Sequence, residues 1–416
     1  MEKLSTREWK RLDVIERLEK GELSVVEAAL VLGLTERRTR DLRDAVAEKG
    51  TEGVVHGNTG RSPVNRISER IRKLIVRLRK TRYRKFNDHH FTEKLVEKEN
   101  VEISRQSVQR LLREAGIGAE RTRRPAKHRR RRDRKPQAGL MLLWDGSPHE
   151  WLEERGPTLC MMGAVDDATS ELLPGAHFLE RECSAGYLRV LRDIAKEKGL
   201  PQSAYMDKHS SLKRNDDNWT LEEELKGERD PTQVERALKA LEIEIIYAHS
   251  PQAKGRVERG WGTHQDRLVS ELRLAGVSGV AAANRVLQWY RPDHNRRFAI
   301  APRESTSAWR PVPPSVDLDR VCSFYYEATV GNDNVVRIHG TVIDVPPGPG
   351  RRGYARAKVE VRQLLDGSWR VYHKDVLIAK APSTTIGEVR ALSGRKRSAA
   401  SRAFRRGVRE IAVSLP

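Results

Sequence analysis

The stretch LMLLWDGS, residues 140–147, places the carboxylate of Asp145 at the end of a short apolar segment. Two more acids have a comparable setting. Asp207 ends the segment SAYMD (203–207), and Glu258 lies in the first turn of a predicted helix within HSPQAKGRVERGWG (249–262). A carboxylate at the rim of a buried strand suits a hard divalent cation, which prefers oxygen ligands. Three converging acids predict a site that holds two metal ions and acts on phosphodiesters.

Around these acids, residues 139–300 alternate between strand and helix patterns. Strands are expected at 140–145, 158–166, 172–180, 203–207 and 243–248, and helices at 184–198, 232–242, 255–272 and 279–290. This order predicts a mixed α/β layer with both faces covered. If the first and fourth strands are neighbours, Asp145 and Asp207 lie side by side at the strand ends. The polar segment 208–230 reads as an insertion near this rim, with Trp219 as its apolar anchor.

The chain is strongly basic, with a net charge of +21 and a pI near 10.1 over 416 residues. Such a charge predicts a polyanionic partner. It is concentrated in residues 121–135, RTRRPAKHRRRRDRK, which hold ten Lys/Arg and one Asp. A block of this kind is typical of a flexible arm that contacts phosphates, and the alternative reading of the charge is a merely basic, soluble protein.

Cysteine usage and hydropathy bound the cellular setting. Cys160, Cys183 and Cys322 have no metal-ligand spacing, and this favours a reducing compartment over a disulfide framework. The sequence contains no run of about eighteen apolar residues and no recognisable export signal. We therefore expect a cytoplasmic, nucleoid-associated protein with no membrane segment.

Two helical segments precede the α/β region. In the first, Ser24 and Thr35 are expected to cap two helices that meet at a turn at Gly33, and the second unit repeats this rhythm with Ser104 as a cap. Basic and amide side chains on the second helix of each unit would enter a DNA groove; they are Arg37, Arg38, Arg40, Arg43, Arg105, Gln106, Gln109 and Arg110. An ordinary helical hairpin with a solvated basic face is the alternative.

Beyond a Pro-rich stretch at 301–315, short strands are expected at 323–331, 335–345, 356–365 and 368–381. Their spacing predicts a small β-barrel. The fold class is therefore multidomain α+β. Its expected parts are helix-turn-helix domains at 1–56 and 64–118, a basic linker at 119–138, an α/β core at 139–300 with the insertion 208–230, a barrel at 316–385 and a basic tail at 386–416.

The motifs LLWDGSPHEW, VDDATSEL, YMDKHSS and HSPQAKGRVERGWGTHQDRL resemble the catalytic core of the retroviral-integrase superfamily, an RNase H-like fold with an Asp-Asp-Glu triad. With its helical N-terminal units the chain resembles bacterial insertion-sequence transposases of the ISNCY type. The resemblance covers roughly residues 140–300. The spacing of 51 from Asp207 to Glu258 (258 − 207) is longer than is usual in that family.

The resemblance implies that Asp145, Asp207 and Glu258 are the catalytic residues and bind two Mg²⁺ ions, with Mn²⁺ as a substitute. It implies cleavage of the element's terminal inverted repeats and joining of the 3′ ends to target DNA, by a dimer or larger assembly on double-stranded DNA. Further expected DNA contacts are Arg129, Arg130, Arg131 and Arg132 in the linker and Lys254, Arg256 and Arg259 around Glu258.

Several nearby residues have simpler expected roles. Asp166 and Asp167 are expected to stabilise a turn, Trp261 to pack in the core, and His209 and His249 to form hydrogen bonds rather than bind metal. Two other functions remain open from sequence. One is a catalytically silent domesticated transposase that acts as a sequence-specific repressor, which an intact acid triad disfavours. The other is an RNase H-type nuclease on RNA–DNA hybrids, which the helical units disfavour.

Overall fold

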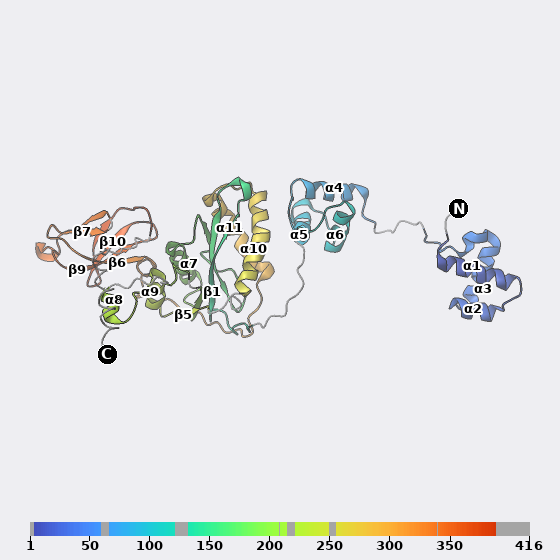
Figure 1. Cartoon of the computed structure of the whole chain (residues 1–416), viewed down its shortest axis with the longest axis horizontal. Helices are drawn as coiled ribbons and strands as arrows, with labels where there is room; N and C mark the ends of the chain where they lie inside the picture. The colour runs from blue at the N-terminus through green and yellow to red at the C-terminus, as the bar shows by residue number, and fades with distance from the viewer. Residues whose placement is uncertain are drawn as a thin grey trace, which may run out of the picture. The chain divides into compact units, whose positions relative to one another are not determined.

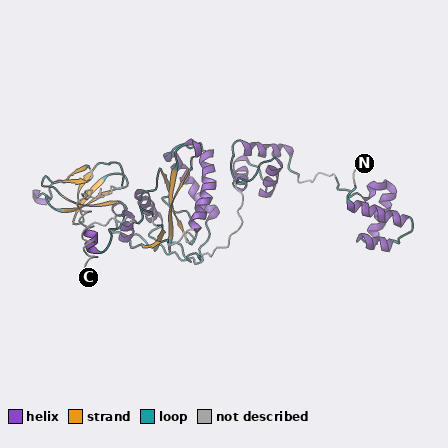
Figure 2. Ribbon diagram, viewed as in Figure 1, coloured by secondary structure: helices purple, strands orange, loops and turns teal. Residues whose placement is uncertain are grey.

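The computed structural model describes residues 4–59, 66–120, 132–207, 209–213, 221–248, 255–338 and 340–387. The chain divides into two compact units, residues 1–74 and 75–416 (Figure 1). Helices dominate the N-terminal part of the chain, and the strands fall into a central sheet and a C-terminal group (Figure 2). The six expected domains are finer than this two-unit division, and their boundaries remain predictions.

The first unit contains α1 (Thr6–Glu19), α2 (Val25–Leu32), α3 (Glu36–Lys49) and a 3₁₀ turn, η1 (Gly50–Val54). Its helix starts follow from capping: Ser24 accepts a hydrogen bond from the backbone of Glu27, and Thr35 caps α3. Gly33 ends α2 with φ of 63°, a conformation that glycine adopts without strain. The expected caps and the turn at Gly33 are confirmed.

Three further helices follow, α4 (Glu69–Lys80), α5 (Asp88–Glu99) and α6 (Arg105–Glu114). Ser104 caps α6 as expected, and Leu111 and Leu112 are buried. Asn100 ends α5 in the left-handed conformation, with φ of 53°. Both segments therefore contain consecutive capped helices, and their assignment as helix-turn-helix domains remains a prediction.

The central sheet has five strands in the order β3-β2-β1-β4-β5. They are β1 (Leu142–His149), β2 (Leu159–Asp166), β3 (His177–Leu179), β4 (Ser203–Met206) and β5 (Glu244–Tyr247). β1 pairs antiparallel with β2 and parallel with β4. The first and fourth strands are therefore neighbours, as expected.

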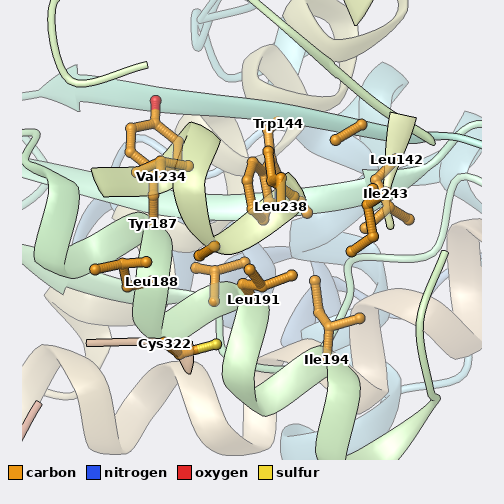
Figure 3. Close-up of a cluster of buried hydrophobic side chains, with 14 of the residues drawn as sticks. Leu142, Trp144, Tyr187, Leu188, Leu191, Ile194, Val234, Leu238, Ile243 and Cys322 are labelled. Atoms are coloured by element: carbon orange, nitrogen blue, oxygen red, sulfur yellow. The ribbon is translucent and has the colours of Figure 1, made fainter. Parts of the chain in front are cut away.

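Helices cover both faces of this sheet. α7 (Ser184–Glu197) and α9 (Gln233–Ala240) pack on one face, and Figure 3 shows part of that core, in which Leu191 and Leu238 lie near Trp144. α10 (Gly255–Leu274) and α11 (Val280–Phe298) pack on the other face, where Leu268 and Leu272 are fully buried. The short helix α8 (Leu221–Lys226) lies in the insertion, whereas Trp219 lies outside the described residues.

Two expectations about the sheet were wrong. β1 does not end at Asp145 but continues to His149, because its backbone remains paired with β2 through Leu159. Pro148 is tolerated there because β4 pairs only with Leu142 and Leu143, so the other edge of β1 is open at that point. The third strand is also shorter than 172–180, although Leu172 makes an isolated bridge to Val165.

The C-terminal region contains α12 (Leu318–Val321), a 3₁₀ turn, η4 (Pro349–Arg351), and six strands. The strands are β6 (Phe324–Thr329), β7 (Val335–Ile338), β8 (Thr341–Asp344), β9 (Lys358–Gln363), β10 (Trp369–His373) and β11 (Val376–Ala381). They form a four-stranded sheet, β11-β10-β9-β6, and a hairpin, β7-β8, around one shared core. Closure into a barrel remains a prediction.

Two segments expected as single strands are hairpins instead. Gly340, with φ of 85°, turns the chain between β7 and β8. Lys374 and Asp375 turn it between β10 and β11, with φ of 47° and 64°. Positive φ at both central residues matches the twist of a two-residue hairpin loop. Neither turn carries the Asn-Gly or Asp-Gly pair that announces such a loop in a sequence.

Within the described residues, no helix is both long enough and apolar enough to span a bilayer.

Acidification should destabilise the second unit through buried histidines. Burial lowers the pKa of His177 to about 4, so the unfolded chain takes up a proton before the folded one does. Stability is therefore full above about pH 6.5 and falls as the pH drops toward 4, by about 2 kcal/mol between pH 7 and pH 5. Thermal unfolding at both pH values should show a smaller acid loss in His177→Gln. An equal loss in both proteins would contradict this assignment. The pKa of His294 is lowered in the same way, so the His177→Gln variant should still lose some stability in acid.

Candidate active site

Asp145 and Asp207 occupy matching positions on neighbouring parallel strands. The register pairs Leu142 with Ala204 and Leu143 with Tyr205, where the pairing of the two strands ends. Continued two residues further, past the end of β4 at Met206, the same register brings Asp145 opposite Asp207. Neighbouring strands lie about 4.8 Å apart, and residues in register point to the same face. Both residues are half-buried. The two carboxylates therefore share one face of the sheet at the end of β4.

The backbone beyond β4 fixes the Asp207 side chain. Its Oδ1 accepts a hydrogen bond from the backbone N–H of His209 at 2.9 Å. This hydrogen bond, from an Asp side chain to the backbone N–H two residues later, is an Asx-turn. Asp207 is thus held at the strand end by its own loop, and its neighbour Lys208 lies outside the described residues.

Glu258 lies in the first turn of α10, and Trp261 brings this helix to Asp145. The indole Nε1–H of Trp261 donates to Asp145 Oδ2 at 3.1 Å, and Gln265 Nε2 donates to Ser147 Oγ at 3.1 Å. Residues three and seven positions apart lie on one helical face. Glu258 therefore shares the face of α10 that runs along β1, one turn before the residue that contacts Asp145. Trp261 is also a core residue, as expected, with 4% of its surface exposed.

Within the described residues, the structure does not bring the three acids together as a metal-binding group. Glu258 is exposed, and within the described residues no group of three His, Cys, Asp or Glu side chains has metal-binding geometry. Residues 249–254, which include His249 and Lys254, lie outside the described residues, as does the side chain of Arg256. Arg259 is exposed, and its Nε donates to the carbonyl of Gly255.

A fourth acid beside the pair was missed from the sequence. The carboxylate of Glu182 lies against Gly146, where a Cβ atom would come within 2.5 Å of Glu182 Oε2. Tyr187 donates its hydroxyl hydrogen to Glu182 Oε1 at 2.5 Å, and His209 Nδ1 lies 3.2 Å from the same oxygen. No motif marks Glu182 in the sequence; the small residue after Asp145 was the only available signal.

The charges of Asp145, Asp207 and Glu182 act on buried groups near the end of β4. Burial raises the pKa of the Tyr187 hydroxyl well above its usual value, and the charges of Glu182, Asp145 and Asp207 raise it further. Burial, followed by the Glu182 charge, raises the pKa of the Cys160 thiol to about 12. A concentration of carboxylate oxygens is the donor set that Mg²⁺ or Mn²⁺ prefers. The residues present therefore fit a hard divalent cation.

The far part of α10 is held by α5. Arg267 makes two hydrogen bonds with the carboxylate of Glu93, at 2.8 and 2.9 Å. Glu271 accepts from Lys94 at 2.7 Å and lies 2.6 Å from His90 Nε2. All five side chains are at most 17% exposed. Breaking a buried pair leaves an uncompensated charge, so this network constrains the helix that carries Glu258.

Asp166 stabilises the turn as expected, whereas the side chain of Asp167 binds the linker instead. Asp166 accepts hydrogen bonds from the backbone N–H groups of Ala168 and Thr169, and burial raises its pKa. Asp167 is fully buried and pairs with Arg132 through both guanidinium nitrogens, at 2.7 and 3.1 Å. This pair anchors the end of the basic linker. It gives Arg132 a structural task, so the DNA contact predicted for it has no support here. Arg129, Arg130 and Arg131 lie outside the described residues.

The predicted groove-reading side chains are mostly exposed. Arg37, Arg38 and Arg40 are exposed on α3, and Arg43 is half-buried; on α6, Arg105, Gln106 and Arg110 are exposed, and Gln109 is half-buried. Arg40 pairs with Glu36, and Arg43 pairs with Asp44. Exposed ion pairs contribute little energy, so these arginines can exchange partners.

Comparisons with known proteins bear on the family of the chain. No protein-family model matches the chain. "Putative transposase y4bF" of Sinorhizobium fredii is 35% identical over 390 residues, 91% of this chain and 84% of the relative. The transposase for insertion sequence IS1202 of Streptococcus pneumoniae is 27% identical over 421 residues, 89% of this chain and 86% of the relative.

Among solved structures, a simian T-cell lymphotropic virus intasome in complex with PP2A regulatory subunit B56 gamma aligns with 74% of this chain and 100% of its own. Its 13% identity and TM-score of 0.32 are too low to support an argument. The two transposase relatives are similar over most of their length, and they confirm the resemblance noted in the sequence. The chain therefore belongs to the transposase family of these relatives.

Proposed function

We propose that this transposase uses Asp145, Asp207 and Glu258 to cleave the ends of its insertion sequence and to join the 3′ ends to target DNA. The observation that carries the proposal is the register of β1 and β4. Continued two residues past its paired positions, it supports a position of Asp145 opposite Asp207 on the face that α10 covers. The Trp261–Asp145 hydrogen bond supports the assignment of Glu258 as the third acid, because it fixes the adjacent helical turn beside the pair.

The three carboxylates would hold two Mg²⁺ ions, with Mn²⁺ as a substitute. Bound there, the ions supply charge that favours deprotonation of an attacking water or 3′-hydroxyl and stabilises the leaving oxygen. The chain's own contribution is placement. Trp261 holds Asp145, the His209 N–H holds Asp207, and α10 carries the exposed Glu258 in its first turn.

Recognition of the DNA ends is assigned to α3 and α6. Both are capped helices that follow a short turn and carry exposed basic residues, the arrangement of a helix that enters the major groove. The net charge of +21 supplies sequence-independent attraction to phosphates. Because transposition brings two ends together, the active assembly is a dimer or larger oligomer on paired double-stranded DNA ends.

The test is an assay of strand cleavage and strand transfer by the purified full chain. The substrates are duplexes that carry the two DNA ends flanking the coding region, incubated with Mg²⁺ and a target plasmid. Cleavage at the ends with joined products supports the proposal. Sequence-specific binding of those ends without any cleavage, in Mg²⁺ or Mn²⁺, would favour a repressor and overturn it.

Binding of the ends should depend on Arg37, in the first turn of α3. Arg37→Ala should weaken binding about tenfold. If Arg37 contacts a phosphate, the slope of log K against log salt concentration should also become shallower by about one. Lys49→Ala, in the last turn of the same helix, removes the same charge far from the groove-facing end and serves as the control. Fluorescence anisotropy at several salt concentrations measures both. Equal losses in the two variants would contradict a specific role for the start of α3.

A further inference from the structure

Glu182 lies behind the acid pair, on the opposite face of the sheet. Successive residues of a strand point to opposite faces, so Asp145 faces α10 while Gly146 faces α7. Trp144, two residues before Gly146, belongs to the core beneath α7, and Leu143, two residues before Asp145, belongs to the core beneath α10. The contact between Gly146 and Glu182 therefore places this carboxylate on the α7 face.

The absence of a side chain at Gly146 is what admits the carboxylate. A Cβ atom at this position would lie 2.5 Å from Oε2 and 2.7 Å from Cδ of Glu182, distances that real Cβ atoms do not show. Glu182 itself precedes α7, whose N-terminal N–H groups favour a negative charge. Tyr187, one turn into that helix and fully buried, fixes the carboxylate by donating its hydroxyl hydrogen to Oε1.

From this fixed position Glu182 reaches the loop that carries Asp207. Its Oε1 lies 3.2 Å from Nδ1 of His209, and the backbone N–H of His209 binds the carboxylate of Asp207. A carboxylate only accepts hydrogen bonds, so the contact is attractive when the ring proton is on Nδ1. The backbone N–H of Ser211 lies 3.3 Å from the same Nδ1 and can donate to it only in the other tautomer, so the Glu182 contact and the Ser211 hydrogen bond exclude each other.

We propose that Glu182 is a positioning residue: held by Tyr187 and admitted by Gly146, it anchors the His209 side chain, and His209 in turn orients Asp207 toward Asp145. Glu182 does not contact the substrate, and it lies on the α7 face, away from the face that the metal ions would occupy. The inference rests on the proposed function, because it deepens the role of the same site.

Metal binding by the full chain, without DNA, tests the inference independently of catalysis. Calorimetric titration with Mn²⁺ should show binding that Asp207→Asn abolishes. Glu182→Gln and His209→Ala should each weaken it about tenfold. The double variant, Glu182→Gln with His209→Ala, should bind Mn²⁺ no more weakly than either single variant, because both substitutions break the same Glu182–His209 contact. His209→Asn, whose side-chain amide can still donate toward Glu182, should recover most of the affinity.

The matched control is Glu180→Gln, which removes the same charge two residues away at an exposed position. It should leave Mn²⁺ binding unchanged. Thermal unfolding of each variant separates positioning from folding: a lower melting temperature with unchanged Mn²⁺ affinity would mean that Glu182 only supports the fold, and would overturn the inference. Additive losses in the double variant would also overturn it.

The strand-cleavage assay supplies the complementary readout. Glu182→Gln should raise the Mg²⁺ concentration needed for half-maximal cleavage about tenfold, with the rate recovered at saturating Mg²⁺. Loss of cleavage at every Mg²⁺ concentration, as expected for Asp207→Asn, would identify Glu182 as a direct ligand and contradict a positioning role. If the wild type binds Mn²⁺ as described but cleaves no DNA, the proposed function fails while this inference stands. If the wild type binds no Mn²⁺ without DNA, this inference fails, and the cleavage assay alone decides the proposed function.

Discussion

Asp145→Asn and Asp207→Asn should each abolish cleavage of the DNA ends, with rates at least about a thousandfold lower than wild type. The reason is that the amide keeps the shape of the carboxylate but removes one of the paired negative charges that would hold the metal ions. Removing one preorganised electrostatic group typically costs two to three orders of magnitude in rate. Glu258→Gln should have a comparable effect, because the third carboxylate comes from α10. Single-turnover cleavage of labelled end duplexes measures all three.

The control for these variants is Glu244→Gln, which removes one carboxylate from the exposed first residue of β5. It should leave the cleavage rate within about twofold of wild type. DNA binding should survive in the three acid variants, because the proposed groove-reading helices are untouched. Retained cleavage in Asp207→Asn would remove the two-metal assignment, and a joint loss of binding and cleavage would point to a folding defect instead.

The central sheet was largely predictable because its signals are local. Apolar segments marked β1, β4 and β5, and the alternation with helices correctly placed β1 beside β4. The end of β1 was not predictable in this way. Gly146, Ser147 and Pro148 are turn-forming residues in isolation, but pairing with β2 keeps them extended. Tertiary context therefore overrode local propensity, and Asp145 lies within a strand rather than at its end.

The parts of the site that the sequence did not reveal depend on contacts across long separations. Glu182 and His209 are 27 residues apart (209 − 182) and carry no shared motif. The contact between Glu93 and Arg267 spans 174 residues. Such pairs form only when the folded chain brings their elements together, so no periodicity or spacing in the sequence predicts them. Trp261 was correctly expected in the core, but its hydrogen bond to Asp145 depends on the register of a helix against a strand.

Trp261 contributes both to the core and to the position of Asp145, and two substitutions should separate these contributions. Trp261→Ala removes a buried indole from the core beneath α10 and should cost about 3–5 kcal/mol of stability. Trp261→Phe keeps an aromatic ring in that core but cannot donate to Asp145. A hydrogen bond to a charged group contributes about 1.5–3 kcal/mol, so the cleavage rate should fall at least about tenfold with a small change in melting temperature.

Trp151→Phe is the matched control for this substitution. Trp151 is buried in the same core, and its Nε1–H donates at 3.0 Å to the backbone carbonyl of Ser147 rather than to Asp145. Both variants therefore lose one indole hydrogen bond and a similar buried surface. We expect comparable losses of melting temperature in the two, with a reduced cleavage rate only in Trp261→Phe. Equal rates in both variants would mean that the indole of Trp261 serves packing alone, and Glu258 would then need another element to align it with Asp145.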